Sequence, residues 1–138
     1  MMIGYNIDNW FIQFPQEWKM SLDKETNQVV FDADKICLYV STMNFKRPET
    51  GEIASVETVS SFVLQAFDQQ GVRVDDSFSN YYPKGFVTYA GTRTTEDGYD
   101  MIAFAICTTG CVLMVYIVGD TGTDFEKYTQ YIKRIERN

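Results

Sequence analysis

Apolar and polar residues alternate in several short runs of this chain, a spacing typical of β-strands that bury one face. The clearest run covers residues 36–43, where apolar side chains recur at every second position. Apolar runs at residues 10–14 and 29–31 predict two shorter strands before it. Pro15 has no amide hydrogen to donate to a sheet, so we expect it to end the first strand.

The apolar spacing then changes from that of a strand to that of a helix. Ser55 is a favourable N-cap residue, and Glu57 lies in the first turn, where the helix dipole favours a negative charge. Gly71 is a residue type that commonly ends a helix. The stripe of apolar residues at helical spacing consists of Val56, Val59, Val63, Ala66 and Phe67. These features predict a helix from Ser55 to about Gly71.

The second half of the chain predicts four more strands and a closing helix. One strand begins near Val72, and three longer ones cover residues 86–95, 99–108 and 111–118, with an Asp97-Gly98 hairpin signal between the first two of these three. The last two strands are apolar on both faces, so we expect a sheet that is covered on both sides or strongly curled.

Residues 123–138 have the pattern of an amphipathic helix. Thr123 and Glu126 have the spacing of a capping box. The apolar stripe that follows consists of Phe125, Tyr128, Ile132 and Ile135. Basic residues follow near the end of this segment, where the helix dipole favours cations.

The resulting order β-β-β-α-β-β-β-β-α predicts the α+β class, with an antiparallel β-sheet covered by two main helices. The chain has 138 residues, of which 15% are aromatic. This length is common for one domain and allows a core of its own, so residues 1–138 are predicted to form a single α+β domain.

The element order resembles the PsbP-like fold, an α/β sandwich shared by the photosystem subunit PsbP, the yeast Ran-binding Mog protein and related bacterial domains. The resemblance rests on the motif Phe14-Pro15-Gln16-Glu17-Trp18, on a central helix after three strands, and on a closing helix at residues 123–138. It implies that Trp18 folds back into the core. Some bacterial members of this fold resemble type VI secretion adaptors that bind effector proteins, but the resemblance carries no functional residue of the family over to this chain.

The charge balance narrows the choice of partner. The chain has 12 basic and 19 acidic residues, giving a net charge of −7. This argues against nucleic acid, whose phosphates need clustered cations, and against an anionic membrane surface, but it allows a basic protein surface. Residues 1–8 show no signal-peptide pattern, and no apolar run approaches the length of a membrane span, so we expect a cytoplasmic protein.

The three cysteines are expected to be reduced thiols, because their odd number and spacing suggest neither a disulfide framework nor a zinc site. Cys107 and Cys111 bracket a short turn, and a bridge between them across a hairpin is the alternative.

The residues predict no catalytic, cofactor-binding or metal-binding site. The chain has no histidine, so a cysteine nucleophile would lack an imidazole base. The loop at residues 119–123 lacks the lysine and the glycine spacing of a phosphate-binding loop. The paired carboxylates are interpreted as turn residues; they are Asp32 with Asp34, Asp75 with Asp76, and Glu96 with Asp97.

The function predicted from these observations is a non-catalytic protein-binding domain, such as an adaptor, a chaperone or an immunity-like protein. The candidate protein-binding residues are Asp75, Asp76, Tyr81 and Tyr82, in a segment whose polar pattern suggests a sheet edge and whose tyrosines and carboxylates suit a basic partner. The alternative is a small-molecule-binding protein or enzyme with a pocket between sheet and helix.

Overall fold

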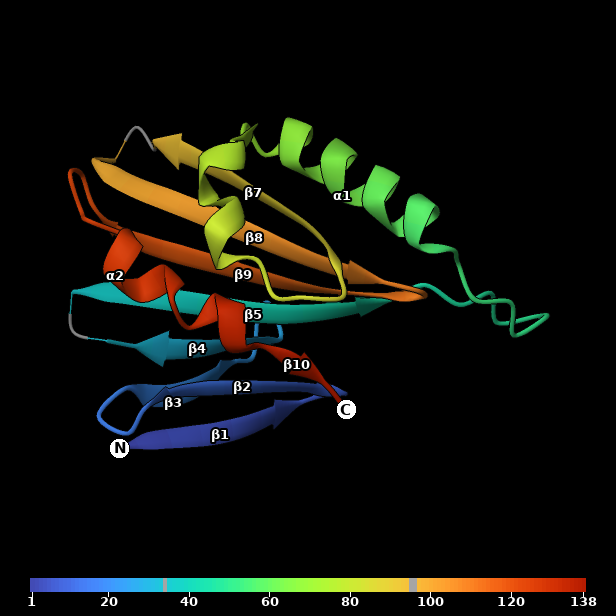
Figure 1. Ribbon diagram of the computed structural model, residues 1–138, viewed down its shortest axis with the longest axis horizontal. Helices are drawn as coiled ribbons and strands as arrows, with labels where there is room; N and C mark the ends of the chain where they lie inside the picture. The colour runs from blue at the N-terminus through green and yellow to red at the C-terminus, as the bar shows by residue number, and fades with distance from the viewer. Residues whose placement is uncertain (34, 95–96) are drawn as a thin grey trace.

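The structure is a computed structural model that describes residues 1–33, 35–94 and 97–138. In these residues, one antiparallel sheet has seven strands in the order β3-β4-β5-β9-β8-β7-β6, and a smaller one has three in the order β1-β2-β10 (Figure 1). The strands of the large sheet are β3 (Lys19–Asp23), β4 (Gln28–Asp32), β5 (Ile36–Asn44), β6 (Arg73–Val74), β7 (Val87–Thr94), β8 (Tyr99–Thr108) and β9 (Cys111–Asp120). Those of the small sheet are β1 (Met2–Ile7), β2 (Trp10–Pro15) and β10 (Glu136–Arg137). The mixed α+β class predicted from the sequence is confirmed.

The centre of the large sheet joins two distant parts of the sequence. Strand β5 pairs with β9 over its full length, from Ile36 opposite Gly119 to Asn44 opposite Cys111. The tight turn between β8 and β9 places Gly110 at a φ of 73°, a conformation that glycine adopts at little cost. The pairing of β5 with β9 sets the two halves of the chain side by side.

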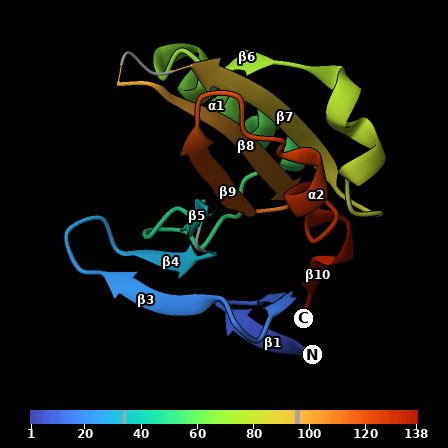
Figure 2. The same cartoon turned by 90° about the vertical axis from the view of Figure 1, so that its left-hand side faces the viewer.

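The two faces of the large sheet have different covers. We call the face that packs against the small sheet the inner face, and the face on which helix α1 (Val56–Gln69) lies the helix face. Figure 2 shows α1 on one side of the sheet and the short helices on the other. Strands β8 and β9 bury side chains on both faces, as their uniformly apolar sequences predict.

Helix α1 forms as the apolar spacing predicts. The Ser55 hydroxyl accepts a hydrogen bond from the Thr58 amide, and Gly71 follows the helix at a φ of 72°. The buried stripe of Val59, Val63 and Phe67 packs on the helix face of β7, β8 and β9.

The prediction that Trp18 is buried is confirmed. Its side chain is 9% exposed and stacks on Phe14 with 5.0 Å between ring centroids. The Tyr131 ring meets it edge-on at 5.1 Å. The turn after Pro15 therefore returns an aromatic side chain to the core of the inner face.

The closing helix predicted for residues 123–138 is wrong as a continuous helix. The segment forms one turn, α2 (Glu126–Thr129), then the 3₁₀ turn η2 (Ile132–Arg134) and finally β10. The capping box is wrong as well, because the Thr123 hydroxyl donates to the Asp120 carbonyl and Asp124 accepts from the Glu126 amide. The apolar stripe is nevertheless buried on the inner face, since Tyr128, Ile132 and Ile135 join its core.

Residues 123–138 do not form one continuous helix because their helix preference is weak and because their packing favours another backbone conformation. Thr129, Tyr131 and Ile132 are β-branched or aromatic, and such residues lose rotamer freedom in a helix. A short helix depends on tertiary packing for its stability. Here packing favours extended backbone at the end, because Arg137 pairs with Trp10 in the small sheet and lies 5.0 Å from its ring.

Three edge elements also differ from the prediction. The sequence did not predict β1, although Ile3, Tyr5 and Ile7 alternate with Gly4 and Asn6, nor did it predict β3, whose side chains are mostly exposed. The strand expected from Val72 is only two residues long, and the 3₁₀ helix η1 (Asp76–Tyr81) follows it. Position 95, the predicted end of the strand that begins at residue 86, lies outside the described residues.

Candidate functional site: a half-covered sheet face

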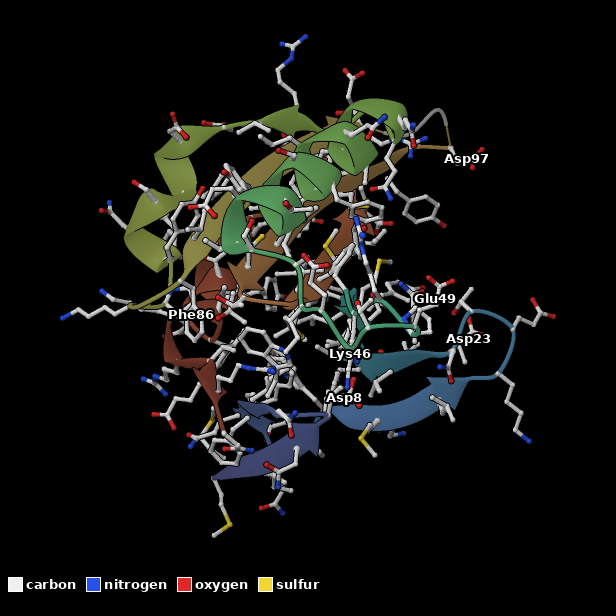
Figure 3. The ribbon with its side chains drawn as sticks, turned by 90° about the vertical axis from the view of Figure 1, so that its right-hand side faces the viewer. Asp8, Asp23, Lys46, Glu49, Phe86 and Asp97 are labelled. Carbon is white, nitrogen blue, oxygen red and sulfur yellow. The ribbon has the colours of Figure 1, made fainter. Side chains whose placement is uncertain are left out.

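Helix α1 covers only part of the helix face. It lies over part of β7, β8 and β9, and no helix formed by the described residues lies over β5 and β4 on that face. Figure 3 shows α1 above this region, the β3–β4 hairpin with Asp23 below it, and the turn with Asp97 near the end of α1. We call the part of the helix face that α1 leaves uncovered the bare strip. Its floor residues are half-buried, and they are Cys37, Tyr39, Met101, Tyr116 and Val118.

The register of the strands brings these side chains together. Tyr39 on β5 lies opposite Tyr116 on β9, and Cys37 lies opposite Val118. Met101 on β8 is the other cross-strand neighbour of Val118. Directly opposed residues in antiparallel strands project from the same face, so the two tyrosines lie on neighbouring strands at the centre of the strip.

The bare strip is hollowed in two places that adjoin. One hollow has a volume of about 360 Å³ and the other of about 350 Å³. Both are lined by Tyr39 and Val118, so they adjoin along the floor, and we call the two hollows together the groove. The remaining lining residues are Gln28, Gln70, Arg93, Met101 and Tyr116 in the first hollow, and Lys35, Ile36, Cys37, Tyr99, Gly119 and Asp120 in the second.

The end of α1 makes one wall of the groove. Gln70 is the C-cap residue of the helix, and the Tyr116 hydroxyl donates a hydrogen bond to its side-chain oxygen at 3.3 Å. Burial raises the pKa of Tyr116 above its ordinary value. The Tyr116 ring therefore packs at the border of the covered region, with its hydroxyl held by the helix.

A carboxylate lies beside the centre of the groove, because Asp32 on β4 is the cross-strand neighbour of Cys37. Burial raises the pKa of Tyr39, and the negative charges of the Cys37 thiolate, Asp23 and Asp32 raise it further. Burial also raises the pKa of Cys37, and the charge of Asp32 adds to that effect. A nearby negative charge disfavours a second one, so Asp32 acts on both groups and Asp23 acts on Tyr39.

The four candidate residues from the sequence lie elsewhere, at the edge beyond β7 and over the inner face. Asp75 accepts a hydrogen bond from the Ser77 amide at 2.9 Å, which is the main reason why its pKa is lowered. Tyr81 donates to the Glu126 carboxylate at 2.8 Å, and this bond raises its pKa. Tyr82 is half-buried against the inner core, and burial raises its pKa.

These contacts give three of the four residues a structural role, whereas Asp76 is exposed in η1. The sequence placed this segment at a sheet edge. This is partly as expected, since the Asp75 amide donates a hydrogen bond to the Ala90 carbonyl of β7 before the chain leaves the sheet. The binding role of this segment stays a prediction.

The cysteines have no partner thiol in the structure, and all three are free. Cys107 lies opposite Val112 and Cys111 opposite Thr108, so the two sulfurs project from opposite faces of the β8–β9 hairpin. This geometry excludes the alternative of a bridge across the hairpin.

Groups of three or more carboxylate or thiol side chains that could hold a metal ion are absent among residues 1–33, 35–94 and 97–138. Two of the carboxylate pairs singled out in the sequence are incompletely described, because Asp34 and Glu96 lie outside these ranges. None of the helices formed by the described residues has both the length and the apolar character needed to cross a membrane.

The sequence held a partial signal for the groove. The run at residues 36–43 already placed Cys37 and Tyr39 on the face opposite Ile36 and Leu38. Nothing in that run shows that Tyr116 lies beside Tyr39, because their pairing depends on the register between β5 and β9.

No protein-family model matches the sequence, and no curated protein is significantly similar to it. A solved structure of a Bacteroides thetaiotaomicron protein is similar to this chain, with a TM-score of 0.63 and 10% sequence identity. The match covers 94% of this chain and 45% of that one, so this chain spans less than half of its length. At this identity the likeness shows the fold alone.

Proposed function

We propose that this chain is a non-catalytic protein-binding domain, of the adaptor, chaperone or immunity-like kind, and that it docks its partner on the bare strip. The observation that carries the proposal is the half-covered helix face, where Tyr39, Tyr116 and Val118 are only half-buried while the neighbouring floor under α1 is fully buried. Aromatic side chains with polar tips are enriched at protein interfaces, and an open apolar surface beside a covered one marks a docking region.

The chemistry of the thiols supports a role without catalysis. The chain contains no histidine to act as a general base. Burial raises the pKa of Cys107 to about 11 and also raises the pKa of Cys37. The thiolate is the nucleophilic form, so both groups are poor nucleophiles near neutral pH.

Small-molecule binding is the second candidate, and one observation favours it. Each hollow, at about 360 and 350 Å³, falls within the size range of roughly 300–1,000 Å³ that is usual for ligand pockets. The two hollows are open and adjoin each other, which suits an extended surface of a partner better than an enclosed ligand.

Two further expectations from the sequence remain proposals. Membership of the PsbP-like fold is supported by the buried Trp18 after Pro15. The other two features of the resemblance differ among the described residues, because α1 follows five strands instead of three and the closing segment is not one continuous helix. A cytoplasmic location is supported by three free thiols, two of which cannot reach each other across their hairpin. Alkylation of unreduced protein, taken directly from its cells and unfolded in denaturant so that the buried thiols are exposed, should modify three thiols.

Site-specific photo-crosslinking in the native cell tests the docking proposal. A benzoylphenylalanine in place of Tyr39 should form one discrete protein adduct, and the same substitution at Tyr81 should form little. Adducts from position 81 alone would move the interface to the segment around η1. A small ligand that co-purifies with the parent protein, and is lost from a Tyr39→Ala variant, would favour the second candidate.

A further inference from the structure

Opposite charges lie beside the two long sides of the bare strip. One cross-strand row runs from Arg93 on β7 through Met101, Val118 and Cys37 to Asp32 on β4, and Lys19 on β3 follows it. Neighbouring strands lie about 4.8 Å apart, so Arg93 and Asp32 are separated by roughly 19 Å. The charge directly beside the strip is therefore cationic at β7 and anionic at β4, with a cation one strand further out at β3.

Of the two tyrosines, Tyr39 lies nearer to β4. Tyr39 is on β5, directly beside β4, where Val30 is its cross-strand neighbour. Burial raises the pKa of Tyr39, and the carboxylates of Asp23 and Asp32 raise it further. Arg93 lies three strands away, at roughly 14 Å by the strand spacing, and Lys35 is at the far end of the second hollow.

We infer that the bare strip binds a segment of a partner protein that combines apolar side chains with a lysine or arginine. This inference rests on the proposed docking function and names the chemistry of the partner. The apolar side chains pack on Tyr116, Val118 and Met101. The cationic group lies against the Tyr39 ring, within the field of Asp23 and Asp32.

Two kinds of physical attraction support this occupant. A tyrosine ring attracts a cation placed over its face, because the centre of the ring is electron-rich. The carboxylates on β3 and β4 attract the same cation and repel an acidic segment. The charge of the whole chain, −7, acts in the same direction at longer range.

The experiment uses two synthetic peptides that differ only in charge. The first is acetyl-Leu-Lys-Leu-Leu-Lys-Leu-amide, and in the second both lysines are replaced by glutamine. Each is titrated into ¹⁵N-labelled full-length protein, and amide shifts are followed by NMR. The lysine peptide should shift the amides of Tyr39, Tyr116 and Val118 and should bind at least about five-fold more tightly than the glutamine peptide.

Matched charge variants separate a local effect from overall attraction to an acidic protein. Asp23→Asn with Asp32→Asn should weaken binding of the lysine peptide roughly three- to ten-fold. Asp75→Asn with Asp76→Asn removes the same charge from the segment before and within η1 and should change binding less than about two-fold. Asparagine at position 23 keeps a side-chain acceptor for the turn amides of Glu25 and Thr26.

A second pair of variants tests the role of the ring. Tyr39→Phe should bind the lysine peptide as the parent does, whereas Tyr39→Leu should bind it about three-fold more weakly. Far-ultraviolet circular dichroism should confirm that all variants remain folded.

Three results would overturn the inference. Equal binding of both peptides at the groove would show that the cationic group does not contribute to binding, while docking on the bare strip would remain supported. Equal losses in the two double-Asn variants would show non-local attraction only. Shifts confined to the residues around η1 would assign the cationic partner to that segment, and the crosslinking experiment would then decide the proposed function separately.

Discussion

The covered and bare halves of the helix face differ in the size of their floor residues. Under α1 the residues that β8 contributes to the floor are small, namely Ala103, Ala105 and Cys107, and all are fully buried. On the bare strip the equivalent positions of β5 and β9 carry Tyr39 and Tyr116, which are half-buried. Small side chains let a helix approach the sheet closely, whereas large side chains with polar tips fill the space themselves and keep their hydroxyls in reach of water.

The difference shows how one sheet face supports both stability and recognition. The covered half gains from the close packing of Val59, Val63 and Phe67 against the small floor residues. The floor side chains of the bare half are partly buried, and no helix formed by the described residues covers them. It is therefore the part of this face where a partner can still gain apolar contact.

The largest expected effect on stability comes from removing a buried side chain between α1 and the covered half. Phe67→Ala should lower the free energy of unfolding by about 3–5 kcal/mol, because it removes a fully buried ring between α1 and the sheet. Tyr39→Ala should lower it by less than about 1 kcal/mol, because that side chain is already partly hydrated. Urea unfolding of both variants measures the difference, and similar losses would mean that the two halves are equally packed.

A smaller effect should come from overfilling the floor. Ala105→Leu inserts volume beneath α1 and should cost about 1–3 kcal/mol. Ser41→Leu makes a similar enlargement on the bare half, opposite Met114, and should change stability by no more than about 0.5 kcal/mol. Thermal unfolding compares the two; a costly Ser41→Leu variant would show that the bare half is not open to new volume.

The smallest effect is kinetic and concerns the thiols. Cys37 on the bare strip should react with iodoacetamide before Cys107, which is fully buried and has a pKa raised to about 11. Both pKa values are raised, so less thiolate exists at a given pH and both rates should increase as the pH rises.

Asp32→Asn sharpens this comparison. It removes the charge that raises the pKa of Cys37, so it should speed alkylation of that thiol a few-fold and leave Cys107 unchanged. Peptide mapping by mass spectrometry measures each site. Faster labelling of Cys107 than of Cys37 in the folded protein would contradict the covered and bare assignment.

Local patterns predicted the interior elements well. Helix α1 begins at its Ser55 cap and ends before Gly71, and the alternation at Ile36, Leu38 and Val40 correctly separates the two faces of β5. The same reasoning failed at the edges, where β3 buries little and its sequence has no strong alternation. It also failed at the C-terminus, where apolar spacing identified the buried side chains of Tyr128, Ile132 and Ile135 but not their backbone.

The candidate site was beyond local reasoning for a related cause. The sequence emphasised Tyr81 and Tyr82 because they stand next to each other and close to Asp75. In the structure Tyr81 is bonded to Glu126 and Tyr82 packs on the inner core. Tyr39 drew no attention, because its partner Tyr116 belongs to a strand far along the chain.

The sequence by itself determined which side chains would be buried, because burial follows from apolar spacing at a period of two or 3.6 residues, and that spacing is local information. Only the tertiary structure decided what covers each face. Strand order and the register between β5 and β9 set Tyr39 beside Tyr116, and the length of α1 left them bare. These choices depend on packing between distant segments, which no single stretch of the chain encodes.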